Sequence, residues 1–137
     1  MDTKAYAQWV IVLINNKGSE PLKLKSLNVI TGKLYADGNK DVEVPASDYE
    51  GKVVAPGEKL QFNSCGLANT PEGTSGTFDL VDPIEDDKLI RHFYWNCPWG
   101  SHNNEWEVTG TNSKWVVESH SNGMEALGVV TVDAMNK

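Results

Sequence analysis

The 137-residue chain has little positive charge and no long apolar segment. Its 12 Lys and Arg residues stand against 19 Asp and Glu, which gives a formal net charge of −7. This deficit excludes non-specific nucleic-acid binding, because phosphate would be repelled, and it excludes docking on anionic lipid through a polybasic patch. No run approaches the roughly 20 apolar residues of a membrane-spanning helix. Any membrane target therefore has to be neutral or zwitterionic, or be recognised by its head group.

Cysteine is scarce as well. Two cysteines, Cys65 and Cys97, do not define a disulfide framework. Each follows a strand-like run, so a bridge between them stays open. In a chain without an export signal we prefer two buried free thiols.

Residues for metal binding or catalysis are also few. The three histidines show no zinc spacing, and neither a Gly-x-Ser-x-Gly elbow nor an acid–base pair is present. Residues 37–41 (DGNKD) resemble the start of a calcium loop, but Val42 stands where that loop requires Gly, which favours a solvated hairpin turn. The sequence therefore predicts no catalytic residue, no metal and no cofactor.

The N-terminal segment is not typical of a signal peptide. An apolar run extends from Trp9 to Ile14, but Asp2 offsets Lys4, so no basic region precedes the run. No small-residue cleavage site follows it. We expect a protein that is cytoplasmic or secreted by a non-classical route, and that acts at the surface of target membranes.

Helical periodicity is nearly absent, and short runs of β-branched or aromatic residues recur between Gly, Pro, Asn and Asp. Leu22 and Leu24 alternate with Lys23 and Lys25, as in a strand with one buried face. The expected strands are residues 6–15, 22–34, 42–44, 59–64, 77–81, 88–95, 105–109, 114–119 and 127–133. This pattern predicts an all-β antiparallel sandwich or barrel, in a single domain over residues 1–137.

One expected strand, AQWVIVLIN, is apolar on both sides. Alternate residues form the two faces: Trp9, Ile11 and Leu13 on one, and Val10, Val12 and Ile14 on the other. A central strand whose outer face is also covered explains this pattern, and so does a partner.

Three of the five tryptophans fall within residues 92–106 (HFYWNCPWGSHNNEW). In the strand before the Cys-Pro-Trp-Gly turn, Phe93 and Trp95 share one face and Tyr94 lies on the other, so a single core cannot absorb all three. Trp99 then falls in a loop, where exposing its apolar ring to water is unfavourable unless something covers it. Either Trp99 folds back to cap the sandwich, or it belongs to a binding surface. We favour the surface, because Trp and Tyr suit interfaces that are apolar on one side and wet on the other.

Polar residues near these aromatics suit a lipid head group. Glu72 lies in the Gly-rich stretch TPEGTSG, and an aromatic wall with a carboxylate is what an ammonium group needs. Ser101 and His102 follow Trp99 and can meet a phosphate.

Several stretches together resemble the aegerolysin family: AYAQWV, GKLYADG with NKDVEV, SCG at 64–66, EGTSGTFDLVDP at 72–83 and RHFYWNCPWGS at 91–101. The similarity runs from about residue 5 to residue 135. It implies a cytolysin-like β-sandwich that binds sphingolipids, either ceramide phosphoethanolamine or sphingomyelin–cholesterol assemblies. It also implies a larger partner with a membrane-attack-complex/perforin (MACPF) domain, which the lipid-bound protein recruits and which forms the pore.

The resemblance also assigns residues. Trp9, Glu72, Tyr94 and Trp99 match positions where the family keeps lipid-facing or head-group-facing side chains. The chain departs from mushroom members at two positions, where Thr31 replaces Trp and His102 replaces Lys. These departures should weaken phosphate contact or change the preferred head group. The candidate lipid-binding residues are Trp9, Thr31, Glu72, Tyr94, Trp99 and His102.

Two other classes stay open. One is a soluble interaction protein of the same fold without lipid or lytic activity. The other is a lectin-like sugar binder, since Trp-lined loops also stack on pyranose rings. A single-component pore former is disfavoured, because the chain offers no long amphipathic segment to insert.

Overall fold

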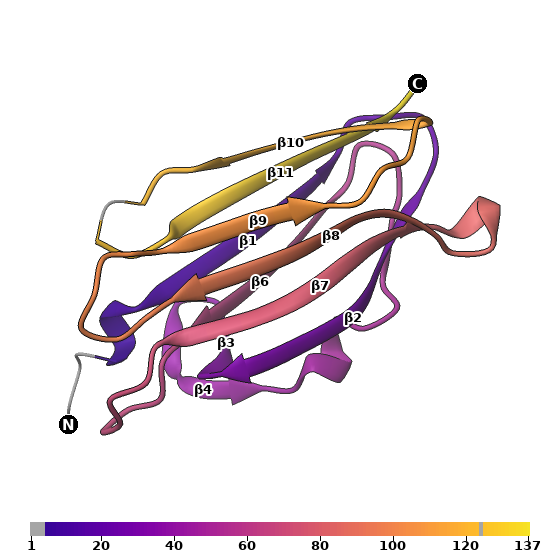
Figure 1. Ribbon diagram of the computed structural model, residues 1–137. Helices are drawn as coiled ribbons and strands as arrows, with labels where there is room; N and C mark the ends of the chain where they lie inside the picture. The colour runs from indigo at the N-terminus through magenta and orange to yellow at the C-terminus, as the bar shows by residue number, and fades with distance from the viewer. Residues whose placement is uncertain (1–4, 124) are drawn as a thin grey trace.

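The computed structural model describes residues 5–123 and 125–137 as two packed β-sheets (Figure 1). The first sheet has the order β10 (Trp115–Ser121), β11 (Gly128–Asn136), β1 (Trp9–Asn16), β6 (Lys59–Cys65), β3 (Lys33–Ala36) and β4 (Asn39–Val44). The second has the order β5 (Val53–Val54), β2 (Leu22–Thr31), β7 (Thr74–Asp82), β8 (Lys88–Cys97) and β9 (Glu105–Thr109). The predicted all-β sandwich is confirmed. Neighbouring strands are antiparallel except β1 and β11, which pair in parallel.

Helical structure in the described residues is limited to three single turns of 3₁₀ helix: η1 (Ala5–Ala7), η2 (Ala46–Asp48) and η3 (Pro83–Glu85). None of the helices in this part of the chain has the length and apolarity to cross a bilayer.

The doubly apolar strand is β1, near the middle of the six-stranded sheet. Its inner residues Val10, Val12 and Ile14 are completely buried, whereas the outer residues are half-buried. Part of the cover on the outer face comes from the β3–β4 hairpin. Lys40 places its ammonium 5.2 Å from the centre of the Trp9 ring. The fold itself therefore covers much of the second apolar face.

The expected strand over residues 22–34 is two strands in different sheets. Gly32 divides them: it has φ 81°, and a Cβ there would lie 2.4 Å from the Cys65 carbonyl oxygen. Only glycine adopts this conformation at so close an approach without strain. The chain leaves the second sheet at Thr31 and enters the first at Lys33. Residues before Trp9, expected to extend β1, instead form η1.

Most of the aromatic window belongs to the core. Phe93 and Trp95 are fully buried, and the Phe93 ring stacks on Phe78 with centroids 4.5 Å apart. The Trp95 indole donates to the Thr74 hydroxyl at 3.0 Å. Trp106 packs at 5.9 Å from the Phe93 ring. Tyr94 and Trp99 are the two aromatics of this window that the core does not enclose.

A buried carboxylate secures the end of the sandwich that carries η3. The Asp82 side chain is 0% exposed and accepts hydrogen bonds from Lys114 Nζ at 2.8 Å, Trp115 Nε1 at 3.1 Å and the Ile84 amide at 3.0 Å. Burial by itself would raise the pKa of Asp82, but the hydrogen bonds from these three donors outweigh it and lower the pKa. Asp82 is therefore ionised in the folded protein at neutral pH.

Both thiols are free and buried. Cys97 lies within hydrogen-bonding distance of Gln8, with Sγ 3.4 Å from Oε1. Burial raises the pKa of Cys97, and it raises that of Cys65 to about 11. At neutral pH both groups are protonated, which makes them poor nucleophiles.

Candidate functional site

Several connections meet at one end of the sandwich, on the left in Figure 1: η1, the β6–β7 loop (66–73), the β8–β9 loop (98–104) and the β10–β11 connection. We call this surface the loop end. The opposite end carries η3 and the β9–β10 connection. The loop end is where β6 and β8 finish and where β1, β7 and β9 begin, so it gathers residues from the whole length of the chain.

Short contacts join the connections of the loop end. A Cβ at Gly73 would lie 2.9 Å from the Trp99 amide nitrogen and within 1.9 Å of the Cys97 carbonyl oxygen, so the Glu72 loop packs directly on the Cys-Pro-Trp-Gly turn. Asn104 donates to the Glu125 carbonyl at 3.2 Å, which ties the β8–β9 loop to the β10–β11 connection.

Trp99 is the tryptophan that the fold leaves most exposed, with 39% of its surface open. It is absent from the hydrophobic core cluster, whereas Trp9 and Trp106 pack against that cluster. Gly100 follows with φ 72°, and a Cβ there would meet nothing within 4 Å. The indole therefore stands on an open turn at the loop end.

Trp9 lies at the same end but is half-buried. It lines a hollow of about 450 Å³ together with Ala7 of η1 and Asn122, Gly123 and Ala126 of the β10–β11 connection. Because Lys40 covers part of its ring, Trp9 presents less free area than Trp99 does.

The two polar candidates at the loop end are both exposed. Glu72 directly precedes Gly73, and this places its backbone beside the Trp99 turn. His102 lies in the β8–β9 loop three residues after Trp99. The Ser101 hydroxyl accepts a hydrogen bond from the Asn103 amide at 3.0 Å, so it is used within the loop.

Thr31 is the last residue of β2, and it pairs with Ser75 of β7. Its hydroxyl is 2.8 Å from that of Ser75. In the next ladder, between β7 and β8, Ser75 is opposite Asn96, and the Asn96 side chain donates a hydrogen bond to Glu105 at 3.0 Å. Thr31 therefore belongs to a polar row that crosses the second sheet.

Tyr94 is separate from Trp99 in the structure. It lines a hollow of about 290 Å³ on the outer face of the second sheet, together with Thr77, His92, Glu107 and Thr109. Burial raises the pKa of Tyr94, and the carboxylates of Glu105 and Glu107 add to the effect. The His92 ring pairs with Asp79 beside the hollow, at 2.5 Å. The structure therefore divides the predicted residues between the loop end and the adjoining sheet face.

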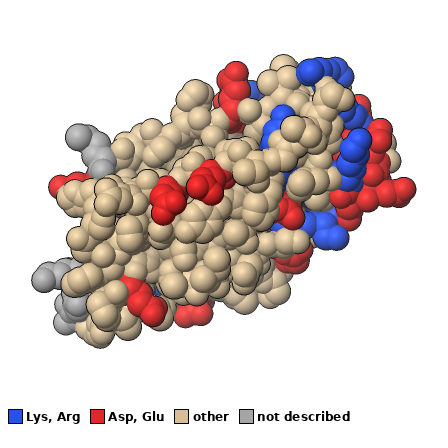
Figure 2. Space-filling model, viewed as in Figure 1, with Lys and Arg blue, Asp and Glu red and all other residues tan. Residues whose placement is uncertain are grey.

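The charges of the molecule are unevenly distributed. On the face shown in Figure 2, the Lys and Arg side chains gather toward the end that carries η3, while the loop end is mostly uncharged. The β6–β7 and β8–β9 loops contain no Lys or Arg, and Glu72 is their one carboxylate. This asymmetry was not visible in the sequence, because the lysines that pair at the η3 end come from distant segments.

Sequence reasoning also missed a network that holds η1 against the first sheet. Lys33, which is only 9% exposed, donates to the Tyr6 hydroxyl at 2.9 Å, and that hydroxyl donates to Asp41 at 3.0 Å. Lys40 donates to the Tyr6 carbonyl at 2.7 Å. The four residues come from three segments, and no local motif signals their meeting.

A family model described as Aegerolysin matches residues 7–137 of the chain. The chain belongs to the aegerolysin family. This aegerolysin is 57% identical to Ostreolysin A6 of Pleurotus ostreatus over 135 residues, which cover 97% of the chain and 98% of the relative. It is 55% identical to Aegerolysin Aa-Pri1 of Cyclocybe aegerita over 138 residues, with 99% and 95% covered. Asp-hemolysin of Aspergillus fumigatus is 39% identical over 137 residues, with 98% and 96% covered.

Among solved structures, the aegerolysin is similar to IP-1A from Alcaligenes faecalis, with a TM-score of 0.87 and 31% identity over 98% of this chain and 94% of that one. Family membership identifies the protein as a non-enzymatic, lipid-binding relative of cytolysins. The prediction that the aegerolysin is not an enzyme is thereby confirmed.

Proposed function

We propose that this aegerolysin docks through its loop end on membranes that contain sphingolipid, and that the bound protein recruits a MACPF-domain partner that forms the pore. The observation that carries the docking step is the exposed Trp99 indole on an end surface whose β6–β7 and β8–β9 loops lack Lys and Arg. Trp favours the bilayer interface because its ring is amphipathic. A surface without fixed positive charge suits zwitterionic rather than anionic lipid.

The head group is recognised by the polar residues beside Trp99. Glu72 binds the ammonium group, since its loop packs against the Trp99 turn and its carboxylate faces no lysine or arginine in that loop. His102 and the loop amides contact the phosphate. Trp9 adds apolar area at the edge of the surface. Ceramide phosphoethanolamine and sphingomyelin each carry a zwitterionic head group with a phosphate and an ammonium, phosphoethanolamine in the first and phosphocholine in the second.

Thr31 and Tyr94 lie on the adjoining outer face of the second sheet, and they contact lipid that reaches beyond the loop end. In this role Thr31 supplies a hydroxyl where mushroom relatives supply an indole. We therefore expect weaker or altered lipid preference rather than loss of membrane binding. The protein reaches its target membrane from the cytoplasm or after non-classical secretion.

A vesicle panel tests the docking step. Sedimentation with phosphatidylcholine–cholesterol vesicles that also contain ceramide phosphoethanolamine, sphingomyelin or phosphatidylserine should give binding with the two sphingolipids only. Ile84→Ala provides a matched control, because Ile84 is 59% exposed at the opposite end and should not affect binding. Equal binding to ceramide phosphoethanolamine vesicles and to plain phosphatidylcholine vesicles would rule out a head-group site. Sphingomyelin has the same phosphocholine head group as phosphatidylcholine, so the sphingomyelin vesicles test recognition of the ceramide and cholesterol parts instead.

Recruitment is tested separately. Dye release from sphingolipid vesicles should require both this protein and a MACPF-domain protein from the same source. The MACPF protein should sediment with the vesicles only when the aegerolysin is bound. Release by the aegerolysin without any partner would contradict the division of roles.

A further inference from the structure

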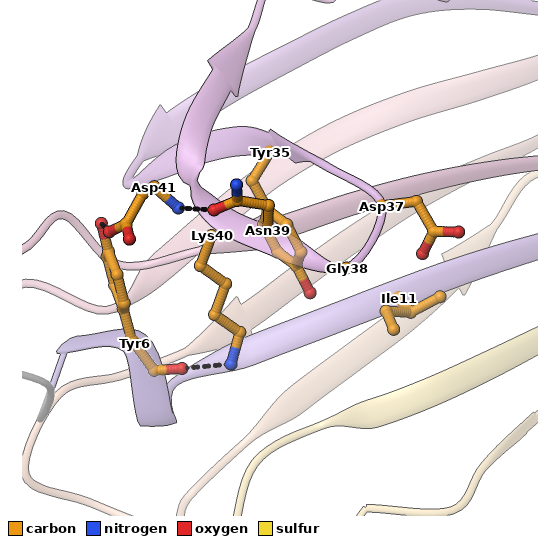
Figure 3. Close-up of a pocket in the computed structure, with 8 residues that line it drawn as sticks. All are labelled: Tyr6, Ile11, Tyr35, Asp37, Gly38, Asn39, Lys40 and Asp41. Carbon is orange, nitrogen blue, oxygen red and sulfur yellow. Dashed lines mark hydrogen bonds between the residues drawn. The ribbon is translucent and has the colours of Figure 1, made fainter.

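A hollow lies on the outer side of β1, away from Trp99 and Glu72. It has a volume of about 480 Å³ (Figure 3). Ile11 of β1 and Tyr35 of β3 form its base. Asp37 of the exposed β3–β4 turn and Asn39 at the start of β4 lie at its rim. A hollow of this size, with an apolar base and a few convergent polar groups, has the features of a small-ligand site.

The hydroxyl of Tyr35 is the group that points to a ligand. The residue is only 3% exposed, and Figure 3 shows its hydroxyl directed past Gly38 into the hollow. Among the described residues no hydrogen bond engages this hydroxyl, and it is not one of the buried polar atoms that the fold leaves unsatisfied, so it is open to the hollow. A tyrosine hydroxyl that lines a hollow is available to pair with the polar groups of a ligand there.

The protonation of Tyr35 defines what it can bind. Burial, together with nearby Cys65 and Asp37, raises the pKa of Tyr35 to about 12. The hydroxyl is therefore neutral at physiological pH, and it can both donate and accept a hydrogen bond.

The charges around the hollow are balanced. Asp37 and Asp41 contribute carboxylates, while Lys40 contributes an ammonium from the wall and Lys33 lies behind Tyr6. A cationic ligand would be repelled by the lysines, and an anionic ligand would be repelled by the aspartates. The surface favours a neutral ligand with several hydroxyl groups, which can accept from Lys40 and Asn39 and donate to Asp37.

We infer that this hollow binds a pyranose sugar, with the apolar face of the ring on Ile11 and its hydroxyls paired with Tyr35 and the β3–β4 turn. The site is distinct from the proposed sphingolipid surface, since neither Trp99 nor Glu72 lines it. The sugar can be a free glycan or the head group of a glycolipid. Both present the same ring and hydroxyls to the protein.

The test uses the full-length ¹⁵N-labelled protein titrated with glucose, galactose, mannose and N-acetylglucosamine. At least one sugar should shift the backbone amides of residues 37–41 in a saturable manner. Tyr35→Phe keeps the ring and removes the hydroxyl, so it should weaken the dissociation constant by about tenfold. Tyr49→Phe is the matched control, because the Tyr49 ring packs 6.0 Å from Phe62 outside this hollow. Asp37→Ala, at an exposed turn position, should weaken binding to a similar degree and serves as a second variant if Tyr35→Phe unfolds.

Vesicles identify the source of the sugar. If it is a glycolipid head group, Tyr35→Phe should weaken binding to phosphatidylcholine vesicles that contain glucosylceramide, and leave binding to sphingomyelin–cholesterol vesicles unchanged. If it is a free glycan, only the titration should respond to the substitution. The inference is overturned if no sugar shifts these amides and glucosylceramide binding is insensitive to Tyr35→Phe, or if both variants bind sugar as the parent does. Binding to sphingomyelin–cholesterol vesicles without added sugar tests only the proposed lipid surface. Failure of the sugar site can therefore be distinguished from failure of the proposed membrane docking.

Discussion

Replacing Trp99 by alanine tests the docking surface most directly. The indole is 39% exposed on the Cys-Pro-Trp-Gly turn and does not belong to the core cluster. The substitution should therefore reduce membrane binding much more than it reduces stability. Trp115→Ala is the contrasting variant, because that ring is 1% exposed and its indole donates to Asp82.

The size of the effect follows from the free area of the ring. With a tryptophan surface of about 250 Å², the exposed 39% amounts to roughly 100 Å² that a membrane can bury. At about 25 cal/mol per Å² this contributes about 2.5 kcal/mol, or about a 60-fold change in the dissociation constant. Trp115→Ala should instead destabilise the fold by about 3–5 kcal/mol.

The assay combines sedimentation with sphingomyelin–cholesterol vesicles and thermal unfolding followed by circular dichroism. We expect Trp99→Ala to lose at least tenfold in vesicle affinity and to melt within a few degrees of the parent protein. Vesicle binding within twofold of the parent would remove Trp99 from the docking surface. A fall in melting temperature as large as that of Trp115→Ala would instead identify Trp99 as a structural cap of the sandwich.

Three further predictions concern Glu72, Asp82 and Gly73. Glu72→Gln should change the preference between ceramide phosphoethanolamine and sphingomyelin vesicles without abolishing binding, whereas Glu125→Gln, the matched control at the same end, should not; an unchanged preference would exclude Glu72 from the head-group site. Because the folded pKa of Asp82 lies below its ordinary value, its ion pair stabilises the fold above about pH 4 and loses this effect as the pH falls further. Asp82→Asn should thus cost about 3 kcal/mol in urea unfolding at pH 7 and clearly less at pH 3, and a cost independent of pH would contradict the charge argument. Gly73→Ala introduces a Cβ within 1.9 Å of the Cys97 carbonyl, so it should displace the Glu72 loop and weaken vesicle binding. Gly57→Ala, where a Cβ meets nothing within 4 Å, should cost only the strain of φ 82° and leave binding intact, and equal effects on binding would argue against loop displacement.

Strand alternation was readable from the sequence because burial in a sandwich follows the period of two. Leu22 and Leu24 are fully buried and Lys23 is not, as the pattern predicts. The ends of the strands were predicted less accurately. The chain crosses from one sheet to the other at Gly32, and that crossing depends on the approach of Cys65, which lies on a strand that is remote in sequence. The two-residue strand β5 carries too short a pattern to be recognised.

The candidate site was predictable in part for the same reason. The position of Trp99 after a Cys-Pro turn indicates a loop, and its exposure agrees with that expectation. Tyr94 was predicted to bind lipid and to lie on the strand face opposite Phe93 and Trp95. The sequence did not show that this face forms a hollow with Glu107 of β9, apart from the Trp99 turn. The hollow at Tyr35 was not predicted, because it forms only where the β3–β4 hairpin meets η1 and β1.

The order of side chains along the chain was sufficient for the all-β class, the resemblance to the aegerolysins and the exposed aromatic turn, since each depends on neighbours within a few residues. Which loops meet, which lysines cover Trp9 and Tyr6, and which tyrosine hydroxyl faces the hollow beside β1 were decided only when the two sheets packed. Such contacts join residues that are tens of positions apart, and their geometry depends on strand register and on crossings such as Gly32 rather than on any local pattern.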